Sequence, residues 1–282
     1  MGAADVVPGV SGGTMALILG IYRELVSSIR SFDLKFFKLL FSLKIKKAFE
    51  RASWEFVLPL LAGVLTAVFT LAGLLSRLLH THPEPLWAFF FGLILASIFT
   101  ITGHFKKRTP LVLLWVIVGA VFTYRLVGII PAATPDKTWF LFLCGAAAIC
   151  AMILPGISGA FILVLLGKYQ FVLTAVHNKD FAPLLLVAVG AVAGLFTFIR
   201  ILNLFLKKFP DVTIAVLTGF MLGSLRKIWP WKKTVSGTAL QHNILPEHWN
   251  SDLMMAVCLS AAGFLIVILL SFCAEKKKNR FV

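Results

Sequence analysis

The sequence predicts an all-α, multi-pass membrane protein that is built from two inverted repeats. Hydrophobic residues make up 59% of the 282 residues and charged residues only 14%, so the apolar share lies well above that of soluble domains. Several apolar runs approach or reach the roughly 20 residues that a helix needs to cross a hydrocarbon core about 30 Å thick. A short motif near the N-terminus recurs in the second half of the chain. A soluble fold is therefore not expected.

The first half, residues 1–135, is expected to open with a broken element over 1–22. A basic loop follows at 23–55, where phenylalanines and lysines interleave in a pattern typical of a segment that lies in the membrane interface. Three spans complete this half. Their apolar runs are 56–75, 86–102 and 111–124.

The second half, residues 136–282, is expected to repeat this plan, with a broken element over 139–168 and three spans. The clearest apolar runs of these spans are 184–205 and 253–272. The third spans of the two halves match in kind only, without shared residues that would fix an alignment.

The repeat itself is visible in the residues. Segment 8–12 (PGVSG) recurs as segment 155–159 (PGISG), an offset of 147 residues. Further along the offset falls to 127, where Pro83 matches Pro210 and Gly92 matches Gly219. The difference places an insertion in the basic loop of the first half. Ordered self-similarity of this kind indicates duplication of a structural unit.

Three spans per half is an odd number, so the halves have opposite orientations if each broken element enters and leaves the membrane on one side. This arrangement is an inverted repeat, which is common in transporters. Counting bases by loop gives 17 on the inner side and 9 on the outer side, but a model in which the second broken element crosses once gives the same numbers. The re-entrant interpretation is favoured because Pro155 and Gly156 interrupt the middle of an apolar run.

The formal net charge of +15 would favour nucleic-acid binding in a soluble protein. Here the bases lie in short loops between apolar runs, which is the pattern of positive-inside topology and of contact with anionic lipids. We therefore expect the bilayer, and not nucleic acid, as the partner of these charges.

Each copy of the motif places a proline–glycine break before a serine and a new helix start. Such a start exposes backbone N–H groups and hydroxyls, which can hold an anion such as phosphate. Close helix packing is the more common role of a single glycine-rich turn, but duplication in an inverted pair favours binding from two sides. The candidate phosphate-binding residues are Gly9, Ser11, Gly12, Gly13 and Thr14 in the first copy and Gly156, Ser158 and Gly159 in the second.

Two ionisable residues complete the candidate site. Asp5 is the acid nearest the motif and is a candidate proton carrier, although an N-terminal helix cap explains it equally well. Arg200 is the base that lies deepest in an apolar run and is a candidate partner of the phosphate. Its alternative role is snorkelling towards the interface.

Metal or cofactor chemistry is not expected. The four cysteines lie in apolar segments without metal-ligand spacing, and the six histidines are scattered. Coupling to protons or sodium ions is compatible with the sequence. The opening residues lack the basic region and apolar run of a signal peptide, and the abrupt start is compatible with a further helix ahead of Met1.

Segments 2–14 (GAADVVPGVSGGT) and 154–159 (LPGISG) resemble those of the bacterial polyprenyl-phosphate transporters, a family formerly known as a membrane domain of unknown function. The resemblance covers nearly the whole chain. It implies a place in the bacterial cytoplasmic membrane and translocation of undecaprenyl phosphate, the carrier lipid of cell-wall synthesis, from the outer to the inner leaflet for reuse. Ala160 departs from the small hydroxyl residue of many relatives and leaves the second copy with one fewer donor.

Two other functions stay open on the residues alone. A small-anion transporter would use the same phosphate cradle. A membrane-embedded lipid phosphatase is disfavoured, because the sequence offers no clustered arginine and histidine set and no acidic pair spaced for magnesium. We therefore expect a transporter and not an enzyme.

Overall fold

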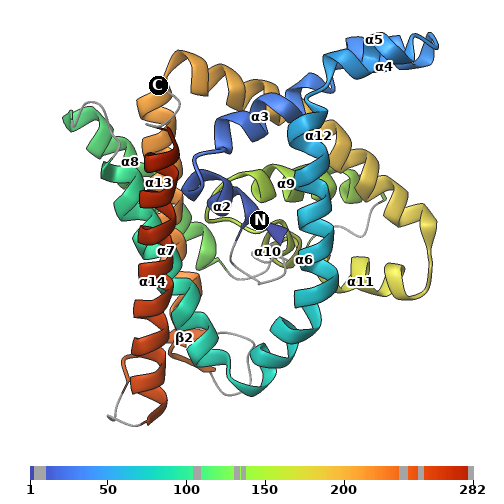
Figure 1. Ribbon diagram of the computed structural model, residues 1–282. Helices are drawn as coiled ribbons and strands as arrows, with labels where there is room; N and C mark the ends of the chain where they lie inside the picture. The colour runs from blue at the N-terminus through green and yellow to red at the C-terminus, as the bar shows by residue number, and fades with distance from the viewer. Residues whose placement is uncertain are drawn as a thin grey trace.

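The computed structural model describes residues 1–2, 11–103, 109–129, 134, 138–234, 241–246 and 251–278. In these ranges the chain is helical apart from one antiparallel hairpin of two short strands (Figure 1). The elements are α2 (Gly12–Ile18), α3 (Tyr22–Ser31), α4 (Leu34–Phe41), α5 (Ile45–Arg51), α6 (Trp54–Thr81), α7 (Pro83–Gly103), α8 (Pro110–Val127), α9 (Thr138–Ile153), α10 (Gly159–Leu165), α11 (Tyr169–His177), α12 (Phe181–Lys208), α13 (Pro210–Ile228), β1 (Lys232–Thr234), β2 (Gln241–Asn243) and α14 (Ser251–Lys278).

The prediction of a helical, multi-pass membrane protein is confirmed. Within the described residues, five helices are long and apolar enough to cross a membrane, namely α6, α7, α8, α12 and α14. Each of them covers one of the apolar runs seen in the sequence. Helices α10 and α11 together would make a sixth candidate, and they meet at a bend of 113°.

The helix break predicted at Pro155 and Gly156 is present. Helix α9 ends at Ile153 and α10 begins at Gly159. Proline has no N–H to continue the helical ladder, and Gly156 adopts a φ of +84°, which L-residues with a side chain rarely tolerate. The second copy of the motif is therefore a tight turn between two helices that pack on each other.

The internal repeat reappears in the boundaries of the helices. Helices α2 and α10 both have seven residues and start 147 positions apart, each after a serine. Gly20 and Gly167, also 147 apart, both take positive φ at the bend that follows. Helices α6 and α12 both have 28 residues at an offset of 127, and α7 and α13 both begin at a proline at that same offset.

The insertion predicted in the basic loop consists of helices α4 and α5. The sequence predicted one interfacial segment over 23–55, and the structure divides that range into three short helices. Asp33 caps α4 by accepting from the Phe36 N–H at 2.9 Å, and it receives the Arg51 guanidinium of α5 at 2.6 Å. This hydrogen-bonded pair lowers the pKa of the Asp33 carboxyl. Phe32, Phe36 and Trp54 pack edge to face beside it.

The second span of each half packs against the third span of the other half. Helix α7 packs along α14, and α8 packs along α13, so each pair joins one helix of the first half to one of the second. Both contacts depend on glycine. A side chain on Gly92 would meet the Ser260 carbonyl oxygen at 1.9 Å, and one on Gly219 would meet the Val116 oxygen at 2.3 Å.

These two crossings are equivalent. Gly92 and Gly219 are 127 residues apart, and their partners Val116 and Ser260 are 144 apart. The reciprocal contacts obey the same offsets, because Gly119 approaches the Val216 oxygen and Gly263 approaches the Phe89 oxygen. The third spans, which the sequence could match only in kind, therefore correspond residue by residue at an offset of 144.

The described core has two centres. One centre lies between α7, α13 and α14 and includes Ile94, Met221 and Val267. The other lies between α2, α3, α12 and α13 and includes Tyr22, Ile199 and Leu217. Helix α2 contributes Ile18 to the first and Ala16 to the second. The short helix that follows the first motif thus sits between both cores.

Candidate functional site

The two motifs meet in the structure. The Ser11 hydroxyl donates to the Met152 carbonyl oxygen at 3.0 Å and lies 3.3 Å from that of Leu154. In the reverse direction, the Gly156 N–H donates to the Thr14 hydroxyl at 3.0 Å. The end of α9 has carbonyl groups without helical partners, and the serine of the other motif satisfies them. Residues 141 to 143 positions apart are thereby joined across the two halves.

The approach is close enough to require glycine. A side chain on Gly13 would meet the Ile153 oxygen at 2.4 Å, and one on Gly156 would meet the backbone of Phe220 and Met221 on α13 at 2.8 to 3.0 Å. Gly159 approaches the Ala148 oxygen of α9 in the same way. Glycine at these positions therefore lets three backbone segments pack at contact distance.

The candidate residues are mostly buried in this conformation. Gly12, Gly13, Gly156 and Gly159 are buried, and Ser11 and Thr14 are 2% and 0% exposed. The N–H of Gly156 already has the Thr14 hydroxyl as its acceptor. An anion that used this N–H would have to replace the contact between the motifs.

The two copies are not used alike. Ser11 caps α2 by accepting from the Gly13 N–H at 3.1 Å, whereas the Ser158 side chain makes no capping bond to α10 and is partly exposed. Thr14 bonds the opposite motif, but Phe161 occupies the corresponding place in the second copy, 147 residues later. The hydroxyl groups of the first copy therefore hold the turn of the second, and Ser158 is the hydroxyl that stays available.

The structure does not bring every candidate together. Asp5 and Gly9 lie outside the described residues. Arg200 is exposed on α12 and forms no hydrogen bond or ion pair with the described residues of either motif. Its neighbour Ile199 faces the core at 1% exposure, so the arginine points away from that core.

A polar cavity of about 440 Å³ lies between α3 and α12, near the first motif. Its lining includes Arg23, Ser27, Asn203 and Lys207. Asn203 is the most buried polar residue of this lining, at 7% exposure. Because Arg23 and Lys207 share one cavity, the start of α3 and the end of α12 lie on the same side of the molecule.

An apolar cavity of about 540 Å³ lies beside the second turn. Leu154, which precedes Pro155, lines it together with Trp115, Phe198, Phe209 and Phe220. Trp115, Phe198 and Phe220 come from α8, α12 and α13, and Phe209 lies between α12 and α13. A hydrocarbon chain is the kind of group that such a lining would accommodate.

Sequence reasoning missed the role of Tyr22. The match between Tyr22 and Tyr169 was visible, but the two differ in the structure. The Tyr22 hydroxyl donates to the Ile153 carbonyl oxygen at 3.1 Å and the residue is 2% exposed, while Tyr169 is half-buried and has no such bond among the described residues. Only the contact between the halves distinguishes them, and a sequence repeat does not carry that information.

This difference gives a matched test. Replacing Tyr22 by phenylalanine leaves the buried Ile153 oxygen without that donor, which is expected to cost about 1–3 kcal/mol of stability. Replacing Tyr169 by phenylalanine is expected to change stability by less than about 0.5 kcal/mol. Thermal melting of both variants in detergent measures the difference, and equal melting temperatures would contradict the assigned role of Tyr22.

Comparison with known proteins extends these observations. A family model described as undecaprenyl phosphate translocase-like matches residues 1–245. The chain is 42% identical to a polyprenyl-phosphate transporter of Vibrio cholerae, over 98% of this chain and 94% of the relative. It is 34% identical to a polyprenyl-phosphate transporter of Staphylococcus aureus, over 82% and 83%. No solved structure gives a significant match. The chain therefore belongs to the undecaprenyl phosphate translocase-like family.

Proposed function

We propose that this protein carries undecaprenyl phosphate across the bacterial cytoplasmic membrane, from the outer to the inner leaflet, so that the carrier lipid can be reused. The observation that carries the proposal is the hydrogen-bonded meeting of the two motifs at Ser11, Thr14 and Gly156. Both curated relatives are named for polyprenyl-phosphate transport, and their matches cover most of this chain.

The two halves are proposed to be inverted with respect to each other. The contacts between α8 and α13 advance together, from Val116 with Gly219 to Tyr124 with Arg226, so these helices run in the same direction. Only residues 104–109 separate α7 from α8 in the sequence, and so short a separation favours antiparallel neighbours. Helix α7 then opposes α13, its counterpart in the other half. This order supports an inverted repeat of the kind found in transporters.

The proposed orientation in the membrane combines the charge count with the position of two bases. Arg23 and Lys207 line one cavity, whereas the single-crossing model would separate them to opposite sides. This shared cavity supports the re-entrant model, in which the inner side carries 17 bases and the outer side 9. Helices α3 to α5 then lie at the cytoplasmic surface.

The buried contact between the motifs is proposed to be the closed state of the transport site. A phosphate that enters would take the N–H of Gly156 and the hydroxyls of Ser11, Thr14 and Ser158 as donors, in place of their present partners. Charge-assisted bonds to phosphate are stronger than the neutral bonds that they replace. The prenyl chain would remain in apolar surroundings such as the cavity at Leu154, so only the headgroup needs a polar path.

The roles of Arg200 and Asp5 are proposed separately from the contact between the motifs. Arg200, exposed on α12, would meet a lipid headgroup at the protein surface and not between the motifs. Asp5 is proposed as the group that couples transport to protons, with sodium as the alternative ion. No bound metal or organic cofactor is needed for the donor set described above.

The decisive experiment follows labelled undecaprenyl phosphate between leaflets of protein-containing liposomes. The parent is expected to move the lipid, and a Ser11→Ala/Ser158→Ala variant is expected to move it at least about 10-fold more slowly, since two charge-assisted bonds are lost. Arg200→Ala tests the surface role in the same assay.

Four outcomes would count against the proposal. No lipid movement by the parent would remove the function, and unchanged movement in every variant would remove the site. Uptake of inorganic phosphate without lipid movement would assign a small-anion transporter, and release of inorganic phosphate from the lipid would assign a phosphatase.

A further inference from the structure

Two lysines, one at the C-terminal end of α13 and one at the start of β1, lie against aromatic rings. The Lys227 ammonium is 5.2 Å from the centroid of the Phe161 ring, and the Lys232 ammonium is 4.6 Å from a ring of Trp87. Lys232 also donates to the backbone oxygen of Lys227 at 2.5 Å. Neither lysine forms an ion pair with an acid in the part of the chain that the structure describes.

Both positive charges lie in a partly buried environment. Burial, together with the nearby charge of Lys227, lowers the pKa of Lys232 to about 8. The elements around Lys232 contribute Trp87 from α7 and Lys227 from α13. The titratable group of β2, His242, is paired with Lys233. Glu84, one turn before Trp87, makes no ion pair with Lys232. Two like charges held this way are unfavourable unless an anion joins them.

The lysine pair is close to the second motif. Phe161, the ring beneath Lys227, belongs to the first turn of α10, two residues after Gly159. On α13, the backbone of Met221 touches the Gly156 turn, and Lys227 follows six residues later, about 9 Å along the helix. An anion held by Lys227 would therefore lie within about two helical turns of the motif contact.

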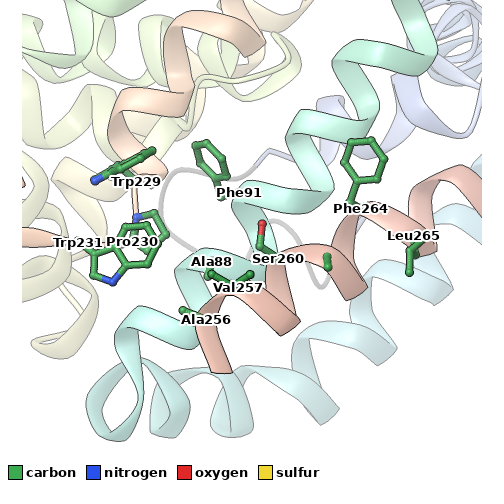
Figure 2. A pocket seen from close by; sticks show the side chains of 11 residues that line it. Ala88, Phe91, Trp229, Pro230, Trp231, Ala256, Val257, Ser260, Phe264 and Leu265 are labelled. Atoms are coloured by element: carbon green, nitrogen blue, oxygen red, sulfur yellow. The ribbon is translucent and has the colours of Figure 1, made fainter. Parts of the chain in front are cut away.

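An apolar groove is lined by the residues that precede Lys232 in the chain. It has a volume of about 510 Å³ and lies between α7, the segment 229–231 and α14 (Figure 2). Trp231 and Ala88, which line it, are the chain neighbours of Lys232 and Trp87. Phe91 and Trp229 close one side, and Val257 lies on the α14 side (Figure 2). A cationic head site thus adjoins an apolar tail site.

We propose that Lys227 and Lys232 bind the phosphate monoester of a prenyl phosphate, whose first prenyl units occupy the adjoining groove. The site lies at the end of α13 opposite to the Arg23 and Lys207 cavity, so it serves the outer leaflet. This inference rests on the proposed function and deepens it, because it supplies the place where the lipid is captured before it reaches the motifs.

The first test measures equilibrium binding of undecaprenyl phosphate to the full chain in detergent. Lys232→Ala and Lys227→Ala are each expected to weaken binding about 10-fold or more, in line with the loss of a hydrogen bond to a charged group. Lys233→Ala is the matched control, since Lys233 is exposed on the same strand, and it is expected to bind within about twofold of the parent. Equal loss in all three variants would overturn the site in favour of a general surface charge.

The second test uses pH, and its sign is fixed by the direction of the Lys232 shift. A phosphate monoester, with a second pKa of about 6, is already doubly charged at pH 7.5. As the pH rises through about 8, free Lys232 loses its proton, so affinity is expected to fall between pH 7.5 and 9.5. Lys232→Arg keeps its charge throughout, and its decline is expected to be smaller than that of the parent, since Lys227 is unchanged in both proteins. A decline in Lys232→Arg as large as that of the parent would refute the role of Lys232.

A third set of measurements separates the source of the phosphate. Val257→Trp, which fills the groove, is expected to weaken binding of undecaprenyl phosphate about 10-fold and to leave inorganic phosphate unaffected. Equal affinity of the parent for inorganic phosphate and for the lipid would show that the groove does not bind the prenyl chain. If the parent moves the lipid between leaflets but Lys227→Ala and Lys232→Ala bind and move it normally, the capture site fails while the transport function stands.

Discussion

Replacement of Gly156 by alanine is expected to abolish transport and to lower stability by about 2–5 kcal/mol, because two independent costs add at this position. Gly156 has a φ of +84°, which strains any residue with a side chain. The new methyl group would also stand 2.8 Å from the Phe220 oxygen and 2.9 Å from the Met221 Cα. Both are backbone atoms of α13, so the helix itself would have to move.

Gly20 provides the matched control for this prediction. It also has positive φ, at +71°, but no described atom lies within 4 Å of where its side chain would begin. Gly20→Ala is therefore expected to show the conformational cost alone, about 1–2 kcal/mol, with transport retained. Melting curves and the leaflet assay on both variants separate the conformational cost from the cost of the steric clash with α13. Equal effects would mean that the contact of the turn with α13 is unimportant.

The prediction bears on mechanism because Gly156 connects three elements. Its N–H bonds Thr14 of the first motif, its Cα touches the middle of α13, and the same helix ends at the lysine pair. A shift of α13 would thus be felt at the motif contact and at the proposed capture site together. Coupling between sites requires such a physical connection with more than one arrangement. Helix α13 is the element that the contacts single out.

Sequence reasoning reached the parts of the fold that are local in the chain. The apolar runs located α6, α7, α8, α12 and α14, and the glycine and proline signals located the break before α10. The repeat was found because the motif keeps its letters in both copies. Helix boundaries at constant offsets then followed, since equal sequence signals start and stop helices at equal places.

Contacts between segments that are far apart in the chain could not be predicted from these local signals. The bond between Tyr22 and Ile153 and the ring contact of Lys227 with Phe161 join residues 131 and 66 positions apart. Their residue types are ordinary, and only packing makes them neighbours. For the same reason the ring contacts of Lys227 and Lys232 could not be predicted, and the alignment of α8 with α14 stayed hidden until glycine contacts revealed it.

The second large effect is expected at the crossings of α7 with α14 and of α8 with α13. Gly92→Leu and Gly219→Leu each place a branched side chain against a carbonyl oxygen that now lies 1.9 or 2.3 Å from the position of the new Cβ. Helices in membranes depend on small residues for such approach, and overpacking typically costs about 1–3 kcal/mol, with more when backbone must retreat. Both variants are expected to melt far below the parent and to give little folded protein.

Gly73→Leu separates this effect from the introduction of leucine as such. Gly73 lies in α6 with no described atom near the position of an added side chain, so this variant is expected to melt within a few degrees of the parent. The repeat also predicts that the two destabilising effects are similar in size. If the two crossings are equivalent, Gly92→Leu and Gly219→Leu must be similarly harmful although they lie in different halves. A large loss at one with tolerance at the other would contradict the pairing of α7 with α14 and of α8 with α13 as symmetric contacts.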